Sequence, residues 1–107
     1  IFMDIQTIQP VVRQYVDAVA KRVQVQAAYL YGSVVQGVFT DESDVDVLIL
    51  SEDFGAMNAD DRSILLYRAS VGFPYDLHVY GVTLEEFESA SRLSTLGQIR
   101  ETSRVLV

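Results

Sequence analysis

Two aspartates, Asp44 and Asp46, stand one residue apart in a segment that is otherwise apolar. Side chains alternate between the faces of a β-strand, so both carboxylates would lie on one face with their Cα atoms about 7 Å apart. Val45 and Val47 would then face the core. Because two unpaired carboxylates repel each other, a divalent cation is their natural partner, and Mg²⁺ prefers such oxygen ligands. The pair predicts a magnesium site.

The dipeptide Gly32-Ser33 is separated from Asp44 by ten residues. It comes where a strand is expected to turn into a short helix. Glycine lets the backbone approach a ligand closely, and the N–H groups at a helix start donate to phosphate oxygens. Ser33 is also suited to cap that helix, which uses the same helix end. Phosphate on one side and metal on the other indicate a nucleoside triphosphate site, with Gly32 and Ser33 as its nucleotide-binding residues.

A third carboxylate, Asp76, is expected inside a strand over 74–80. If this strand pairs beside the one that carries Asp44, the Asp76 side chain can reach the same pocket. Three acidic groups can hold two metal ions about 3.5–4 Å apart, which activates an attacking hydroxyl and stabilises a leaving pyrophosphate. We therefore assign Asp44, Asp46 and Asp76 as catalytic and metal-binding residues. His78 would share the face of Asp76, but a lone strand histidine more often packs at the rim, and we leave it out of the site.

The hydrophobic periodicity predicts the elements that must position these groups. A helix is expected over 8–22, with Thr7 as its N-cap and Pro10 in its first turn. Thr83 and Glu86 form the pattern of a capping box. Other helices are expected over 60–70 after Asn58, over 96–102 and, for a turn or two, over 33–38, with a polar loop over 40–43. Strands are expected over 25–31, 45–50, 74–80 and 104–107. The order predicts a single α+β (α/β-like) domain over residues 1–107, a small mixed β-sheet with flanking helices.

Composition narrows the class of protein. The 107 residues fit one domain, and their 50% hydrophobic content indicates a packed core. The tyrosines at 29, 31, 67, 75 and 80 are expected to pack in that core and on the sheet. The net charge of -7 has the wrong sign for neutralising phosphates, so no nucleic-acid partner is expected. No apolar run approaches the roughly 20 residues of a membrane span. We therefore expect no membrane partner. The absence of cysteine is compatible with a reducing compartment, and we expect a cytoplasmic location.

The spacing of these motifs resembles that of the minimal nucleotidyltransferases, small prokaryotic members of the DNA polymerase β superfamily. The resemblance covers nearly the whole chain and rests on Tyr29-Leu-Tyr-Gly-Ser33, Ser43-Asp-Val-Asp-Val-Leu48, Tyr75-Asp-Leu77 and Val105-Leu-Val107. It implies the nucleotidyltransferase fold and transfer of a nucleoside monophosphate, most often AMP from ATP, to a hydroxyl. It also implies that Asp44 and Asp46 bind two Mg²⁺ ions, that Asp76 binds the catalytic ion and helps deprotonate the acceptor, and that Gly32 and Ser33 hold the β- and γ-phosphates.

The same resemblance implies a partner. Members of this size are commonly paired, as antitoxins, with a helical HEPN-domain toxin, and some attach AMP to a tyrosine of that partner. We therefore expect an ATP-dependent protein adenylyltransferase. Many members carry a basic residue where this chain has Gln36, so a second hypothesis is a binding module that neutralises its partner by contact alone. A small-molecule nucleotidyltransferase would predict an added helical acceptor domain.

Overall fold

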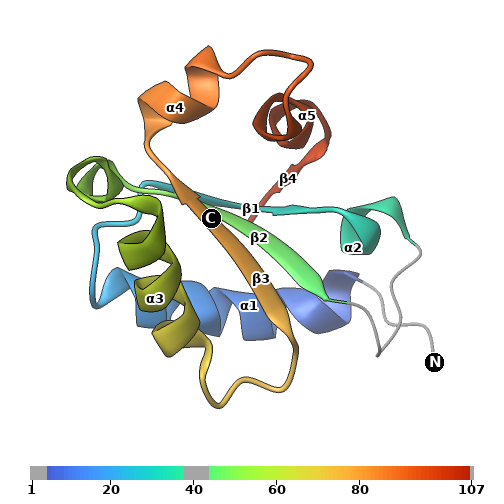
Figure 1. The fold of residues 1–107 in the computed structure, drawn as a ribbon. Helices are drawn as coiled ribbons and strands as arrows, with labels where there is room; N and C mark the ends of the chain where they lie inside the picture. Colours follow the sequence, from blue (N-terminus) through green and yellow to red (C-terminus); the bar gives the residue numbers. More distant parts are fainter. Residues whose placement is uncertain (1–4, 38–43, 107) are drawn as a thin grey trace.

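The computed structural model describes residues 5–37 and 44–106, so the loop predicted over 40–43 lies outside the described residues. Within them, four strands form one mixed sheet in the order β3-β2-β1-β4 (Figure 1). The strands are β1 (Ala27–Tyr31), β2 (Val45–Leu50), β3 (Leu77–Val82) and β4 (Arg104–Val105). β1 runs antiparallel to both β2 and β4, whereas β2 and β3 are parallel. The mixed sheet confirms the predicted α+β fold class.

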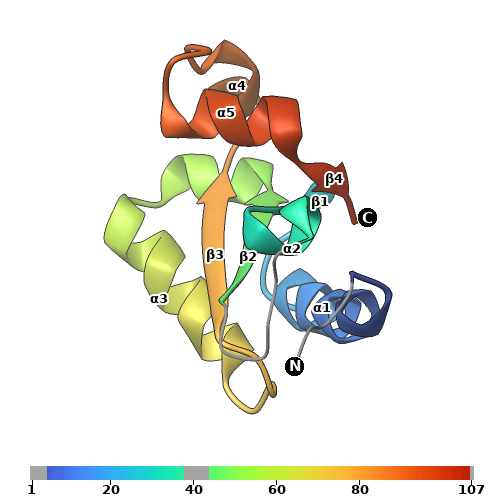
Figure 2. The ribbon, with the colours of Figure 1, turned by 90° about the vertical axis from the view of Figure 1, so that its right-hand side faces the viewer.

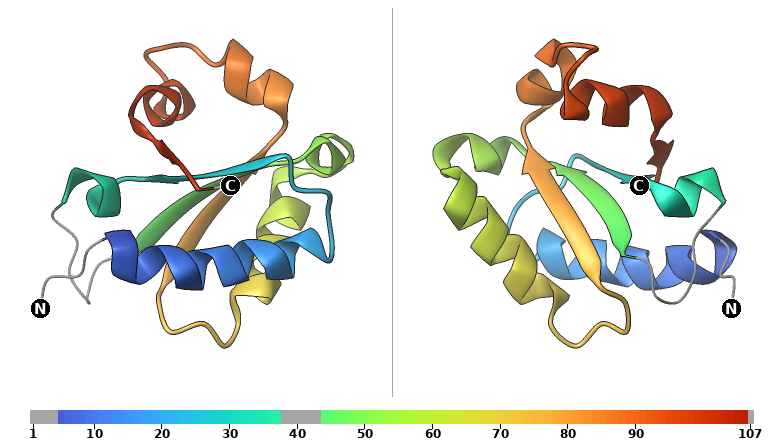
Figure 3. Two further views of the ribbon diagram at one scale, coloured as in Figure 1. Left: turned by 180° about the vertical axis from the view of Figure 1, so that it is seen from behind. Right: turned by 45° about the vertical axis from the view of Figure 1, so that its right-hand side comes forward.

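Helices cover both faces of the sheet. α1 (Ile5–Ala20) and α3 (Ala59–Ser70) lie on one face, and α4 (Leu84–Ser89) and α5 (Thr95–Thr102) lie on the other (Figure 2). The short α2 (Ser33–Gln36) follows β1 and lies near the start of β2 (Figure 3). A 3-10 helix, η1 (Glu52–Ala56), follows β2 and was not predicted. No helix among the described residues is long and apolar enough to cross a membrane.

β2 is the central strand, and its sequence explains its place. Val45, Val47 and Ile49 are fully buried in the core cluster beneath α1 and α3. Leu48 and Leu50 are buried in a second cluster, with side chains of α4 and α5. A strand covered on both faces must be apolar at almost every position, as this one is. The polar exception is Asp46, which is only half-buried.

The first helix confirms its predicted stripe but not its predicted start. Its buried residues recur at spacings of one, three and four: Ile8, Val12, Tyr15, Val16 and Val19. The hydroxyl of Tyr15 donates to the carbonyl of Leu66 on α3 at 2.8 Å, which satisfies its buried polar end. The helix already includes Ile5, so Thr7 lies within it and is not its N-cap, and Pro10 lies inside the helix and not in its first turn.

Side-chain caps fix the ends of two later helices as predicted. The Asn58 side chain accepts the Asp61 N–H at 2.8 Å at the start of α3. At the start of α4, Thr83 and Glu86 form both bonds of a capping box. These contacts satisfy backbone N–H groups that have no partner inside a helix.

Arg62 of α3 joins three elements through one guanidinium. Its Nη1 lies 2.8 Å from a carboxylate oxygen of Glu86 on α4 and donates to the Gly81 carbonyl of β3 at 3.2 Å. Its Nε donates to the Met57 carbonyl at 3.3 Å. The hydrogen bond from Arg62 is the main cause that lowers the pKa of Glu86. The corner where α3, β3 and α4 meet therefore depends on this side chain.

Two strands start or end differently from the prediction. The third strand was predicted over 74–80 but lies at Leu77–Val82, because the first residue of β2, Val45, pairs with Leu77. The preceding residues include Pro74, which has no N–H to give to a sheet. The last strand ends at Val105, after which the Leu106 N–H donates to the Ala28 carbonyl at 2.7 Å.

The tyrosine prediction is wrong for two of its members. Tyr67 on the outer side of α3 is 72% exposed and Tyr80 on β3 is 49% exposed. Tyr29 does pack as expected, since its ring stacks on that of Phe87 with a centroid distance of 5.4 Å. Periodicity alone did not separate the buried tyrosines from the exposed ones, because helix and strand orientation depend on tertiary packing.

Candidate active site

A glycine corner joins β1 to α2 and lies directly against an aspartate. Gly32 is the N-cap of α2, with φ 75° and ψ -148°, a conformation that is essentially restricted to glycine. A Cβ atom at this position would overlap Oδ2 of Asp46. The backbone of the corner and the carboxylate of β2 therefore share one narrow space. Residue 32 must be glycine both for its backbone angles and for the room that Asp46 occupies.

Asp46 lies at the centre of the candidate site because of the sheet register. It pairs with Tyr31 of β1 on one side and with His78 of β3 on the other. Burial is the main cause that raises the pKa of Asp46; the charge of Asp44 raises it further and His78 acts against it. The surroundings of Asp46 therefore favour the neutral carboxyl group, and a nearby cation would stabilise the ionised one.

Asp44 directly precedes β2 and contacts His78 of β3, a residue that was not predicted to belong to the site. Its Oδ2 lies 3.3 Å from Nε2 of His78. The signal for this contact was present in the sequence, since His78 is two residues beyond Asp76 and strand alternation gives both the same face. Recognising it required the pairing of β2 with β3, which places His78 opposite Asp46.

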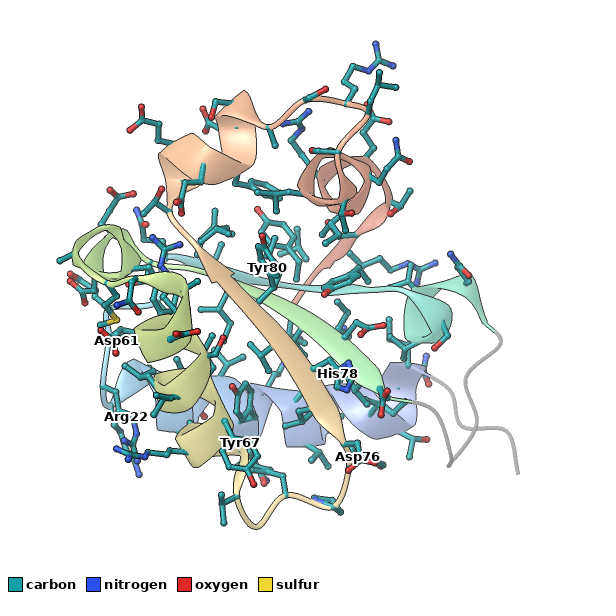
Figure 4. All side chains as sticks on the ribbon, in the orientation of Figure 1. Arg22, Asp61, Tyr67, Asp76, His78 and Tyr80 are labelled. Carbon is teal, nitrogen blue, oxygen red and sulfur yellow. The ribbon has the colours of Figure 1, made fainter. Side chains whose placement is uncertain are left out.

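Asp76 directly precedes β3 rather than lying inside it. Its carbonyl accepts the Val45 N–H at 2.8 Å, which holds its backbone beside the start of β2. Its exposed side chain and those of Asp44 and His78 line one pocket of about 500 Å³. Figure 4 shows Asp76 and His78 at the same end of the sheet. Asp76 and Asp44 thus border a common space, whereas Asp46, which was expected to share it, does not line this pocket.

Gly32 and Ser33 lie at the start of α2. The Gly32 carbonyl accepts the N–H groups of Val35 and Gln36, both at 3.1 Å, and no side-chain bond caps the helix. Ser33 is the first residue of the helix, so Gly32, not Ser33, is the N-cap. Gln36, the last residue of α2, is exposed.

Tyr31 is a second residue near the site that the sequence analysis did not assign to it. Burial, followed by the charges of Asp46 and Tyr80, raises the pKa of Tyr31 to about 12. Its hydroxyl therefore remains protonated at neutral pH and can act as a hydrogen-bond donor. Tyr31 borders Asp46 on the side away from His78.

The donor set fits a hard divalent cation. Among residues 5–37 and 44–106, no three acidic or histidine side chains are gathered closely enough to hold a metal ion as they stand. Mg²⁺, however, is usually held by one or two protein carboxylates together with waters and substrate phosphates. Asp44 and Asp46 would supply two such oxygen ligands, and the burial of Asp46 disfavours its charge when no cation neutralises it.

Comparisons with known proteins identify the family and the fold. The family described as "Nucleotidyltransferase domain" matches residues 12–104. A candidate nucleotidyltransferase from Sulfolobus solfataricus has a similar fold, with a TM-score of 0.68 and 19% sequence identity over 92% of this chain and 78% of that chain. A toxin-antitoxin crystal structure with AMP-PNP is similar with a TM-score of 0.62 and 21% identity, over 88% of this chain and 71% of that chain. No curated protein matches the sequence. At these identities the two structures show that the fold is shared. Because the family match extends over most of the sequence, the chain belongs to the nucleotidyltransferase domain family.

Proposed function

We propose that this domain transfers AMP from ATP to a hydroxyl group of a protein partner, a tyrosine of a HEPN-domain toxin, and thereby acts as its antitoxin. In this reaction the acceptor oxygen forms a bond to the α-phosphorus of ATP. The bond from that phosphorus to the bridging oxygen breaks, pyrophosphate leaves, and the proton of the acceptor hydroxyl passes to a carboxylate of the site. The result is an AMP ester on the partner.

The observation that carries the proposal is the fit of Gly32 against Asp46. Gly32 joins the end of β1 to the start of α2 at a position that only glycine can occupy. This brings the start of α2 next to the half-buried carboxylate of Asp46. Because residue 32 has no side chain, the Asp46 carboxylate lies directly against the backbone at the start of α2, so phosphates held at this helix start would lie next to a cation on Asp46. In our proposal Gly32 and Ser33 hold the β- and γ-phosphates beside the two aspartates.

Two Mg²⁺ ions are the proposed cofactors. Asp44 and Asp46 would hold both, and Asp76 would complete the site of the catalytic ion. When bound, the ions supply charge neutralisation for the triphosphate and polarise the reacting oxygens. The chain's own contribution is to keep Asp44 and Asp46 on adjacent, same-face positions at the start of β2, with His78 contacting Asp44.

Asp76 is the proposed acceptor of the hydroxyl proton. Its side chain is exposed and borders the pocket that Asp44 and His78 also line. The half-buried Asp46 does not line this pocket, so Asp44 and Asp76 are the carboxylates that an acceptor hydroxyl inside it would meet. Removal of a proton by a positioned carboxylate contributes typically about 10²–10⁴-fold to a rate.

The proposal of a toxin partner has two supports. One is the resemblance of the motifs to minimal nucleotidyltransferases that pair with HEPN-domain toxins. The other is the fold shared with a toxin-antitoxin structure that contains AMP-PNP. The acidic net charge of -7 is compatible with a protein partner rather than with a nucleic-acid backbone.

The test is transfer of label from ATP carrying a radioactive α-phosphate to the purified HEPN-domain partner, in the presence of Mg²⁺. We expect labelled partner, and a loss of at least about 100-fold in rate for Asp44→Asn and for Asp46→Asn. Asp60→Asn is the matched control, since Asp60 is an exposed aspartate in the first turn of α3. Unchanged labelling by the two site variants would contradict the proposal.

Gln36 favours a second candidate function, neutralisation by binding alone. Gln36 is the last residue of α2, and its side chain is exposed and uncharged. Many related proteins carry a basic residue here, which can contact a triphosphate. In this case the toxin would be neutralised fully by Asp44→Asn and Asp46→Asn, and no label would reach the partner.

A further inference from the structure

We propose that the acceptor segment of the partner docks along the outer side of α3 and the free edge of β3, as an extended, basic stretch of protein that carries its tyrosine into the pocket beside Asp76. This inference rests on the proposed function and specifies the partner surface it uses. We call this surface the acceptor groove, and define it by Ile64, Tyr67 and Val71 together with the pocket that ends at Asp76.

The pocket has two unlike walls. One wall is polar and carries Asp44, Asp76 and His78. The other is largely apolar and carries Tyr67 and Val71 of α3 and the following turn, together with the rings of Phe73 and Tyr75. Its volume of about 500 Å³ is large enough for an aromatic side chain. A tyrosine could therefore pack its ring against the aromatic wall while its hydroxyl reaches the carboxylates.

An apolar stripe leads from the surface of α3 into this pocket. Ile64, Tyr67 and Val71 are spaced by three and four residues and so follow one side of the helix. Their exposed fractions are 48%, 72% and 69%, which is high for side chains of this size. Tyr67 and Val71 also line the pocket, so the stripe and the pocket form one continuous surface. Figure 4 shows Tyr67 at the same end of the molecule as Asp76.

The edge of β3 beside this stripe can accept an extended chain. The carbonyls of Asp76 and Val82 accept N–H groups on the β2 side, so the even-numbered residues of β3 face β2 with their backbone polar groups. The N–H and C=O groups of Leu77, Val79 and Gly81 therefore point away from the sheet, toward its free edge. The outward Gly81 carbonyl is bound by Arg62, which closes the far end of the edge. Among the described residues, nothing outside the sheet bonds to the outward amide groups of Leu77 and Val79. Such an edge can pair with a strand of another protein.

Charge decides the character of the occupant. The polar wall carries the carboxylates of Asp44 and Asp76, and the whole chain has a net charge of -7. Opposite charges on a partner segment increase its association rate and exclude acidic competitors. The occupant that fits all three features is an extended segment with a central tyrosine flanked by lysine or arginine.

The experiment is an NMR titration of the isotope-labelled protein with a short peptide that has a central tyrosine between lysines and arginines. We expect amide shifts at Tyr67, Val71, Leu77 and Val79. Tyr67→Ser should raise the dissociation constant about tenfold, the loss of one aromatic anchor. Leu93→Ser is the matched control, since Leu93 is 94% exposed in the turn before α5 and lies outside the acceptor groove. Thermal unfolding of both variants checks that each is folded.

Four results would overturn the inference. They are the absence of shifts at millimolar peptide, equal shifts from a peptide with glutamates in place of the basic residues, an equal loss of binding in Tyr67→Ser and Leu93→Ser, and the same shifts when the protein is concentrated without peptide. The last would mean that a second copy of the chain occupies the groove. Because the titration measures binding rather than transfer, its failure is distinct from failure of the labelling test above.

Discussion

Replacing Gly32 by alanine tests the corner that carries the proposed nucleotide site. The substitution acts in two ways, through the backbone and through Asp46. A residue other than glycine at φ 75° and ψ -148° costs about 1–3 kcal/mol. The new methyl group would also overlap Oδ2 of Asp46, so the carboxylate must rotate away. A side chain held off its preferred rotamer costs about 0.5–1.5 kcal/mol more.

The expected loss of stability is therefore about 1.5–4.5 kcal/mol. For a domain of this size, each 1 kcal/mol shifts the melting temperature by roughly 4–8 °C, so Gly32→Ala should lower it by at least about 6 °C. The second effect concerns function, because the displaced carboxylate is a proposed metal ligand. We expect affinity for Mn²⁺, used as a spectroscopic substitute for Mg²⁺ in the presence of ATP, to fall about tenfold or more.

Gly37 provides a control at the other end of α2. It also has a positive φ of 80°, but a Cβ there would meet nothing within 4 Å. Gly37→Ala should therefore cost about 1–2 kcal/mol with Mn²⁺ affinity unchanged. The overlap itself is isolated by repeating Gly32→Ala in an Asp46→Ala background, where about 0.5–1.5 kcal/mol of the cost should disappear. Equal Mn²⁺ affinities for Gly32→Ala and Gly37→Ala, or no coupling with residue 46, would refute this reasoning.

Three further predictions concern the stability of the fold. Because burial raises the folded-state pKa of Asp46, the ionised carboxylate destabilises the fold at pH values above that pKa. Asp46→Asn should therefore raise the melting temperature at pH 7, and this gain should shrink as the pH falls through that pKa in a pH series of thermal melts. A Cβ at Gly97 would overlap the backbone oxygen of Ser91, so Gly97→Ala should lower the free energy of unfolding, measured in urea, by about 1–3 kcal/mol. Gly55→Ala is the control: its added Cβ would make an ordinary contact, so stability should be nearly unchanged. Arg62→Ala should lower the free energy of unfolding by about 2–3 kcal/mol in the same assay. Arg62→Lys should lose less, but should not match the wild type, since lysine lacks the planar guanidinium that joins α3, β3 and α4. Full stability with lysine would contradict that explanation.

Local patterns in the sequence were sufficient where a structure is decided by neighbours along the chain. The apolar run around Asp46 predicted β2 to the residue, and the spacing of Thr83 and Glu86 predicted the capping box at α4. The start of β3 was wrong because aromatic residues favour strands while the actual limit is set by pairing with Val45. The start of α1 was wrong because Thr7 suits a cap but also fits within a helix.

The candidate site shows the same division. The sequence alone was sufficient to place Gly32 at a turn after one strand and Asp46 within the next, but their close approach depends on the register of β1 and β2. The contact of His78 with Asp44 depends on the register between two strands that are far apart along the chain, which no local pattern specifies. The link of Tyr31 to Asp46 has the same origin, since it needs the antiparallel register of β1 and β2.

The most direct measurement is a crystal structure of the protein with Mg²⁺ and a non-hydrolysable ATP analogue. We expect electron density for a cation bound by Asp44 and Asp46, with the phosphates against Gly32 and Ser33. Nucleotide bound elsewhere, or no nucleotide at millimolar concentration, would contradict a catalytic site at this corner.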